Sequence, residues 1–237
     1  MRSKQARLDR FISRQLNIPQ REVKLLLARG QVRVDKSVAN NGQMLVNEFS
    51  HIAVNEQVLQ AIQPKYLMLN KPAGVVSATK DPQHKTVIDL LEPGDHSDLH
   101  IAGRLDFNST GLLLLTNDGR WSRFIASPEN NIYKRYRVTL EKPLDSRYVE
   151  AFSQGLFFDY EGITTRPAKL KILSDYEAEV SLREGRYHQI KRMFGRFQNK
   201  VLTLHRLAIG PLILDAELKP GQSRMLSEQE VADIVRA

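Results

Sequence analysis

An aspartate and an arginine stand two residues apart in a polar loop, directly before the most apolar run of the chain. Arg104 and Asp106 lie in the segment GRLDFNSTGLLLLT, whose apolar run is Gly111–Thr116. The chain has no cysteine, so any nucleophile is of another type, and a carboxylate anchored at the edge of a core is a candidate. Position alone favours the plainer interpretation, that an aspartate here caps a turn or pairs with Arg104. The pattern by itself leaves both interpretations open.

Two further segments carry the argument to a family. KPAG occupies Lys71–Gly74, and EGRYHQIKRMF occupies Glu184–Phe194. Together with GRLD, and in this order over residues 65 to 210, they resemble three motifs of the pseudouridine synthases. With the N-terminal segment described below, the whole chain is similar to bacterial synthases of the RsuA type, which modify small-subunit ribosomal RNA. The resemblance implies that Asp106 is the catalytic nucleophile.

The implied reaction explains these residue types. Uridine becomes pseudouridine when its N1–C1′ bond breaks, the uracil rotates and C5 bonds to C1′, with no net change of atoms and no cofactor. A carboxylate can attack C1′ or C6, or stabilise the cationic sugar, and a neighbouring cation favours its ionised form. Lys191, Arg192 and Arg104 are the candidate cations. The resemblance favours Lys191 for the ion pair and assigns Arg104 to displacing or replacing the target base in the RNA helix.

A stacked base is out of reach of such an enzyme, so the target uridine must be flipped onto an aromatic or apolar surface. Tyr136, in KRYRVTL, is the candidate for that surface. Its alternation with Val138 and Leu140 fits a half-buried strand tyrosine equally well. The resemblance implies the stacking role.

Histidines receive no catalytic or metal-binding role. His188, beside Tyr187, fits a residue that orients the backbone at a helix start or touches phosphate. The spacing of His96, His100 and His205 relative to nearby carboxylates is not that of a metal site, so no metal is predicted. Asp81 and His84, in TKDPQHKT, are typical of a solvated loop.

The elements that must position these side chains indicate an α+β domain over residues 65–237, built on a mixed, mainly antiparallel sheet with flanking helices. The expected elements are strands at Tyr66–Asn70, Gly111–Thr116 and Tyr136–Glu141, around Leu170 and Val180, and at Val201–Leu204, with helices at Trp121–Ala126, Asp145–Gln154 and His188–Phe197. The unbroken apolar character of Gly111–Thr116 predicts burial on both faces of that strand.

A small N-terminal domain is predicted over residues 1–55, followed by a linker over 56–64. RLDRFISRQL has a helical apolar face, Pro19 suits the start of a second helix, Gly30 suits its end, and QVRVD alternates as a strand. The segment resembles an S4 RNA-binding module, although Pro19 and Gln20 replace its usual small hydroxyl or glycine. The predicted RNA contacts are Arg7, Arg21, Lys24, Arg29 and Arg33, with Lys71, Arg186 and Arg192 in the second domain.

Charge favours a polyanionic partner. The formal net charge is +8, and residues 1–60 hold ten Lys or Arg against five Asp or Glu. We expect a cytoplasmic monomer without a membrane span, acting on 16S ribosomal RNA in an assembly intermediate. Two alternatives stay open: a large-subunit synthase of the same family, and a non-catalytic ribosomal RNA-binding assembly factor.

Overall fold

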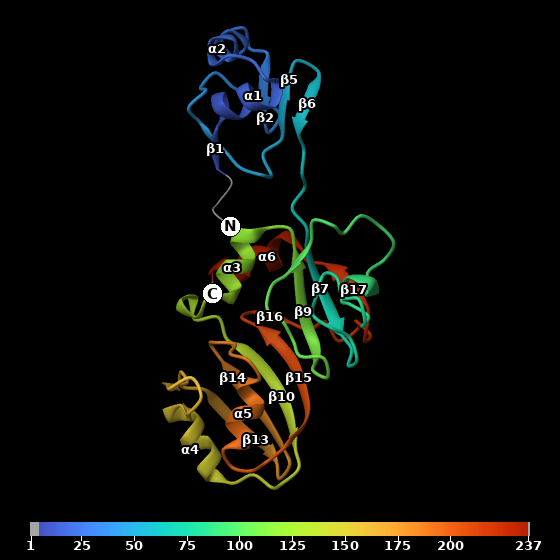
Figure 1. The fold of residues 1–237 in the computed structure, drawn as a ribbon, viewed down its shortest axis with the longest axis vertical. Coiled ribbons are helices and arrows are strands. Elements are labelled where there is room, and N and C mark those ends of the chain that lie inside the picture. Colours follow the sequence, from blue (N-terminus) through green and yellow to red (C-terminus); the bar gives the residue numbers. More distant parts are fainter. Residues whose placement is uncertain (1–4, 237) are drawn as a thin grey trace. The chain divides into compact units, whose positions relative to one another are not determined.

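The computed structural model describes residues 5–236, and the chain divides into two compact units after Pro64. Figure 1 colours the first unit from blue to cyan and the second from teal to red. The first four residues of the domain predicted over 1–55 lie outside the described range. The two units are described separately below.

The first unit packs two short helices against short strands. Leu8 and Ile12 of the first helix, Val23 of the second and Val32 and Ile52 of the strands are fully buried in one cluster. The helical spacing of the apolar residues therefore places them on one face, as the sequence predicts. The elements are β1 (Ala6–Arg7), α1 (Leu8–Leu16), α2 (Gln20–Ala28), β2 (Val32–Val34), β3 (Ser37–Val38), β4 (Leu45–Val46), β5 (Ile52–Val54) and β6 (Gln57–Gln60).

The segment between the units differs from the prediction. Residues 57–60, expected within the linker 56–64, form β6 and pair antiparallel with β5. The turn that makes this hairpin includes Asn55, whose φ of 53° is a left-handed conformation that asparagine tolerates. The connector is therefore confined to the residues between Gln60 and Lys65.

The second unit is built on one nine-stranded sheet. Its path is β13-β14-β10-β15-β9-β7-β17, with β16 paired to β15 and β8 paired to β9. All of its strand pairs are antiparallel except β15 with β9, so the sheet is mixed and mainly antiparallel, as predicted. The strands are β7 (Tyr66–Lys71), β8 (His100–Ile101), β9 (Thr110–Thr116), β10 (Lys134–Leu140), β13 (Lys169–Ser174), β14 (Glu177–Leu182), β15 (Val201–Ile209), β16 (Leu212–Ile213) and β17 (Ser223–Met225), and β11 (Phe157–Phe158) pairs separately with β12 (Ile163–Thr164).

Strand β9 separates two cores. Leu113 and Leu115 belong to the core that contains Phe152 and Phe194, whereas Leu112 and Leu114 belong to the other. Each of the four leucines is 0% exposed, which confirms the predicted burial on both faces.

Four helices cover the sheet, two in each core. Helices α4 (Ser146–Gln154) and α5 (Gln189–Gly195) contribute to the first core, and α3 (Gly119–Ala126) and α6 (Glu228–Arg236) to the second. Figure 1 shows α3 and α6 beside each other. Helix α6 is absent from the sequence-based elements, and β15 continues five residues beyond the predicted Leu204. Within residues 5–236, none of the helices combines the length and the apolar character that crossing a bilayer requires.

Helix α6 is held to the sheet by an ion-pair group. Arg224 of β17 lies 2.8 Å from Glu230 Oε1 and 2.7 Å from Asp215 Oδ2. The hydrogen bond from Arg224 lowers the pKa of Glu230 to about 2. This stabilisation is present above the ordinary pKa of a glutamate and is lost as the pH falls towards about 2.

We therefore expect Glu230→Gln to flatten the acid dependence of α6 docking. Trp121, the only tryptophan, donates its indole N–H to the carbonyl of Val231 in α6 at 3.4 Å, so its fluorescence reports the docking. Between about pH 6 and about pH 3 the wild type should lose about 1 kcal/mol more than the variant. The exposed Glu228→Gln, in the same helical turn, should behave as the wild type. Identical acid dependence in all three proteins would contradict the role of the Glu230–Arg224 ion pair in docking α6.

Candidate active site

Asp106 lies in the loop between β8 and β9 and faces α5. Its Oδ2 is 2.9 Å from Lys191 Nζ, and its Oδ1 is 3.5 Å from His188 Nε2. The Asp106 side chain is 28% exposed, so the carboxylate is reachable from solvent yet partly enclosed. Two of the separated sequence motifs thus meet in one ion pair.

A pocket opens at this ion pair. Asp106, Arg104, Tyr136 and Lys191 all line it. The structure therefore brings together the four residues that the sequence predicts as catalytic. The rest of the wall is formed by Leu105, Ser109, Leu182, Gly185, Arg186, His188, Gln189, Ile190 and Leu204.

Lys71 supports the loop of Asp106 from beneath. It is fully buried, and its Nζ donates to the carbonyls of Pro72, Phe107 and Ser109 at 3.0, 3.1 and 2.8 Å. Burial lowers the pKa of Lys71 to about 8, and the negative charge of Asp106 opposes that shift. The prediction that Lys71 contacts RNA is wrong for this structure, because all of its donors point into the protein. The lysine instead fixes the backbone at Phe107 and Ser109, directly after Asp106.

Arg206 of β15 holds the other side of the same loop. It is 2% exposed and donates to the carbonyls of Leu112 at 2.7 Å, Gly103 at 2.8 Å and Arg104 at 3.4 Å. The sequence analysis missed this residue. The sequence feature that could have revealed Arg206 is a charged residue inside the largely apolar strand VLTLHRLAI. A buried arginine needs hydrogen-bond acceptors, so it must contact other parts of the fold.

A serine hydroxyl completes the support. Ser77 Oγ donates to the carbonyl of Leu105 at 2.7 Å and accepts from the Leu105 amide at 3.1 Å. Leu105 directly precedes Asp106, so both backbone polar groups of the residue before the candidate nucleophile are held. These two hydrogen bonds leave the loop little freedom to move.

The parallel pairing of β9 with β15 requires a glycine. Gly111 has φ +100°, and a Cβ built there would lie 2.3 Å from the carbonyl oxygen of Arg206. Only glycine allows this conformation and this close approach. Arg206 can therefore reach the loop that precedes β9.

Tyr136 lies on β10 directly opposite Arg206 of β15. It is 7% exposed, and its hydroxyl is 3.4 Å from Arg206 Nη1. The ring is thus oriented by a buried cation while it lines the pocket. Its stacking role stays a prediction.

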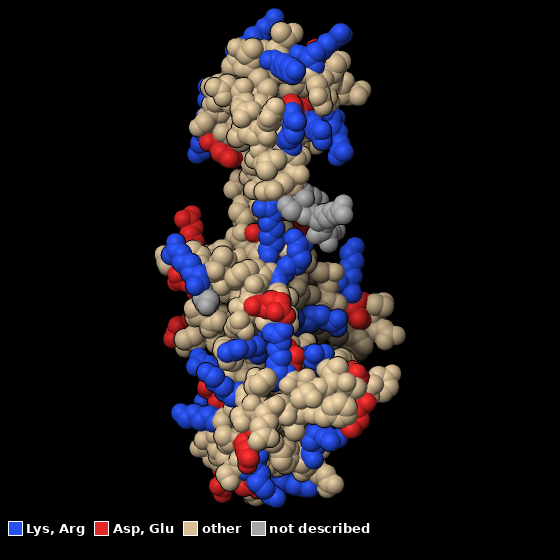
Figure 2. Space-filling view, turned by 90° about the vertical axis from the view of Figure 1, so that its left-hand side faces the viewer, with Lys and Arg blue, Asp and Glu red and all other residues tan. Residues whose placement is uncertain are grey.

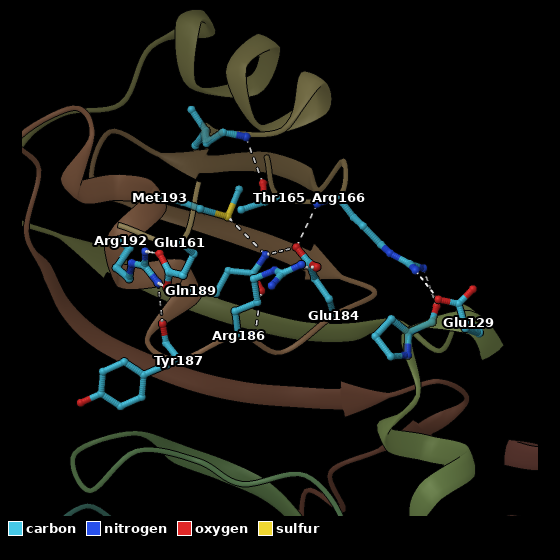
Figure 3. A network of polar contacts seen from close by, with 12 residues as sticks. Glu129, Glu161, Thr165, Arg166, Glu184, Arg186, Tyr187, Gln189, Arg192 and Met193 are labelled. Carbon is cyan, nitrogen blue, oxygen red and sulfur yellow. Dashed lines mark hydrogen bonds and ion pairs between the residues drawn. The ribbon is translucent and has the colours of Figure 1, made fainter. Parts of the chain in front are cut away.

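The start of α5 is fixed by Glu184, as Figure 3 shows. The Glu184 side chain is buried and accepts from the Arg166 amide at 2.9 Å, Gln189 Nε2 at 2.8 Å and Arg186 Nε at 3.1 Å. Gln189 Oε1 in turn accepts from the Arg186 amide at 3.0 Å. The network sets the direction of the helix that carries Lys191.

Arg192 does not serve Asp106. Its guanidinium forms a two-contact ion pair with Glu161 and lies 3.8 Å from the centroid of the Phe158 ring. The interpretation of Arg192 as a candidate cation for Asp106 is therefore wrong, because neighbouring residues of a helix point in different directions. Arg186 and Arg104 are exposed at the pocket. Both guanidinium groups are therefore accessible from solvent, as contact with RNA would require.

Among the described residues 5–64, the Lys and Arg side chains are exposed with one exception. Arg21, Lys24, Arg29 and Arg33 are exposed, whereas Arg7 is half-buried and pairs with Asp9 at 2.5 Å. The hydrogen bond from Arg7 lowers the pKa of Asp9. Figure 2 shows Lys and Arg side chains at the surface of the first unit, in the upper part of the view. Within residues 5–236, no group of three or more His, Cys, Asp or Glu is arranged to hold a metal ion.

Comparisons with known proteins give a consistent assignment. Residues 65–195 match the family described as RNA pseudouridylate synthase. The Ribosomal small subunit pseudouridine synthase A of Pseudomonas aeruginosa is 48% identical over 96% of this chain and 100% of its own length. The protein of the same name from Escherichia coli K12 is 40% identical over 97% of this chain and 100% of its own. A crystal structure of a pseudouridylate synthase is 36% identical, has a TM-score of 0.71, and is matched over 97% of this chain and 99% of that one.

Proposed function

Because the chain belongs to the RNA pseudouridylate synthase family, we propose that it converts a specific uridine of 16S ribosomal RNA to pseudouridine, with Asp106 as nucleophile. The observation that carries the proposal is the ion pair of Asp106 with Lys191, 2.9 Å apart, in a pocket lined by Tyr136 and Arg104. Full-length similarity to enzymes named for the small subunit supports the choice of RNA. A pure phosphate binder would gain nothing from a carboxylate in that pocket.

The reaction balances within the substrate. The N1–C1′ bond breaks, the C5–C1′ bond forms, C5 loses its hydrogen and N1 gains a proton. The Asp106 carboxylate can attack C1′ or C6, or stabilise the positive charge that develops on the sugar. Lys191 supplies the positive charge that balances the carboxylate before the substrate arrives. The two buried cations Lys71 and Arg206 position the loop without entering the pocket lining.

Tyr136 and Arg104 fit the handling of the substrate. The target uracil must leave its stack to reach Asp106, which costs a few kcal/mol. Stacking on the Tyr136 ring offsets part of that cost, about 1 to 3 kcal/mol by comparison with single-strand binding sites. Arg104 is exposed and flanks the carboxylate, so it can occupy the space that the flipped base leaves.

The first unit fits a role in gripping RNA as an S4-type module. Four of its predicted RNA contacts are exposed: Arg21, Lys24, Arg29 and Arg33. Basic side chains of this kind bind the phosphates of nucleic acids. We propose that the enzyme acts in the cytoplasm as a monomer, and that its substrate is an assembly intermediate of the small subunit. The Lys and Arg on the pocket rim would then receive the RNA segment that carries the target.

Substitution of Lys191 tests the ion pair. Lys191→Met should lower kcat about 10² to 10³-fold, the usual effect of removing one electrostatic partner from an active site. Lys191→Arg keeps the charge and should retain more activity than the methionine variant. Arg192→Met is the matched control for charge, because Arg192 pairs with Glu161 and not with Asp106, and its kcat at saturating RNA should stay close to that of the wild type. Wild-type kcat in Lys191→Met would contradict the role of the pair.

The choice of substrate is tested by mapping pseudouridine. Wild-type protein is incubated with 16S RNA, with large-subunit RNA and with partially assembled small-subunit particles, followed by carbodiimide-blocked primer extension. The proposal predicts a single new stop, in 16S RNA only. A stop only in large-subunit RNA would support the alternative synthase. Tight binding without a stop in any RNA would support the assembly factor.

A further inference from the structure

Two aromatic rings stack beside the pocket of Asp106. Tyr187 and His188 lie with ring centroids 3.9 Å apart and ring planes 20° apart. His188 lines the pocket, with Nε2 3.5 Å from Asp106 Oδ1, whereas Tyr187 is 76% exposed. The stack thus leads from the carboxylate to an open aromatic face.

The exposure of Tyr187 is not explained by folding. A tyrosine ring stabilises a protein chiefly through the apolar surface that it buries, and little of the surface of Tyr187 is buried. Its backbone is nevertheless held, because the Tyr187 carbonyl accepts from Arg192 Nη1 at 3.5 Å. Figure 3 shows the ring directed away from the network of Glu184 and Gln189. The main chain is fixed while the ring faces outward.

The turn that carries the two rings is conformationally unfavourable. His188 has φ 50°, a left-handed conformation that costs a non-glycine residue about 1 kcal/mol. The turn is held there because Gln189, the first residue of α5, bonds back across it to Glu184 and to the Arg186 amide. The strain therefore serves to set the directions of the two side chains at the pocket.

The surroundings indicate the ligand. Arg104 and Arg186 are exposed on the wall of the pocket that His188 also lines. An exposed aromatic ring among cations suits a nucleobase with its phosphate, since bases stack on aromatic faces while the backbone meets positive charge. Stacking uses the face of a base and not its edge, so it fixes position without demanding one base type.

We propose that Tyr187 forms a subsite for the nucleobase adjacent to the target uridine, which extends the Tyr187–His188 stack by one ring. This inference rests on the proposed function and deepens it. The subsite holds the RNA in register, so that the neighbouring uridine and no other enters the pocket. Tyr187 is in this account a binding residue, and Tyr136 receives the flipped base itself.

The test compares Tyr187→Ala with Tyr187→Phe on an RNA fragment that contains the mapped target. The alanine variant should lose about tenfold to a hundredfold in kcat/KM, mostly through KM, the size expected for one lost base stack. The phenylalanine variant keeps the ring and should match the wild type. Because the ring is exposed, neither variant should change the melting temperature.

A direct readout uses 2-aminopurine in place of the nucleotide on either side of the target. Its fluorescence should be quenched on binding to the wild type and to Tyr187→Phe, at one of the two positions, and should stay bright with Tyr187→Ala. Tyr176→Ala is the matched control, because Tyr176 is 48% exposed and adjoins the opposite end of β14 from the pocket residue Leu182. It should leave kcat/KM and quenching unchanged.

The two possible failures are distinguishable. Wild-type kcat/KM and full quenching in Tyr187→Ala would overturn the subsite while the synthase stands. A wild type that forms no pseudouridine in any RNA would overturn the proposed function and the subsite with it, and the mapping shows this before any Tyr187 variant is compared.

Discussion

Asp106→Asn should abolish pseudouridine formation, with a loss of at least about 10⁴-fold in kcat, as found when a nucleophile or its essential partner is removed from an enzyme. Asparagine has nearly the same shape, so the loop held by Lys71, Arg206 and Ser77 should persist. It lacks the negative charge that attack or stabilisation of the sugar cation requires. The measurement is single-turnover conversion of 16S RNA in small-subunit particles.

The control for this variant is RNA binding. Asp106→Asn should bind the RNA at least as tightly as the wild type, because a negative charge is removed from a basic surface. Thermal unfolding should show that the fold is intact. Activity within tenfold of the wild type would mean that Asp106 is neither nucleophile nor stabiliser, and that the pocket works through another group.

Lys71→Met should have the largest effect on stability, about 2 to 4 kcal/mol, because three carbonyls, that of the buried Ser109 among them, lose their donor together. The carbonyls belong to Pro72, Phe107 and Ser109, and the last two flank the segment that follows Asp106. We therefore also expect kcat to fall at least about tenfold, since a small displacement of a reacting group is costly. Urea unfolding and single-turnover kinetics measure the two effects.

The matched control for Lys71 is Lys134→Met. Lys134 is also buried, burial also lowers its pKa to about 8, and its Nζ donates to the carbonyl of Ile125 at 3.0 Å. It does not hold the Asp106 loop. Lys134→Met should lose stability but keep its kcat. Equal losses of kcat in both variants would show that general destabilisation, and not the position of Asp106, accounts for the effect.

Periodicity predicted the elements that surround the site. The apolar run at β9 indicated burial on both faces, and both cores confirm it. The helical spacing of Leu8 and Ile12 likewise predicted the buried face of α1. The position of Gly30, with φ +68°, predicted the end of α2. These features depend on neighbours in sequence, which is why sequence patterns report them.

Long-range partners could not be read in the same way. Lys71 looks like a surface lysine beside a proline, and only the fold reveals the three carbonyls around it. Arg206 meets a loop about a hundred residues earlier, through a strand pairing that Gly111 permits. Lys191 and Arg192 are adjacent and equally basic, so the choice between them as partner of Asp106 came from family resemblance. The structure places Lys191 at the carboxylate and Arg192 at Glu161.

The most direct test of the account follows the hydrogen at C5 of uridine. The C5–H bond must break whenever C5 bonds to C1′, so 16S RNA labelled with tritium at C5 of its uridines releases tritium to water on isomerisation. We predict that wild-type protein, with small-subunit particles and no added cofactor, releases close to one equivalent per RNA, and that Asp106→Asn releases none. Tight binding of these particles by the wild type without tritium release would contradict the synthase assignment.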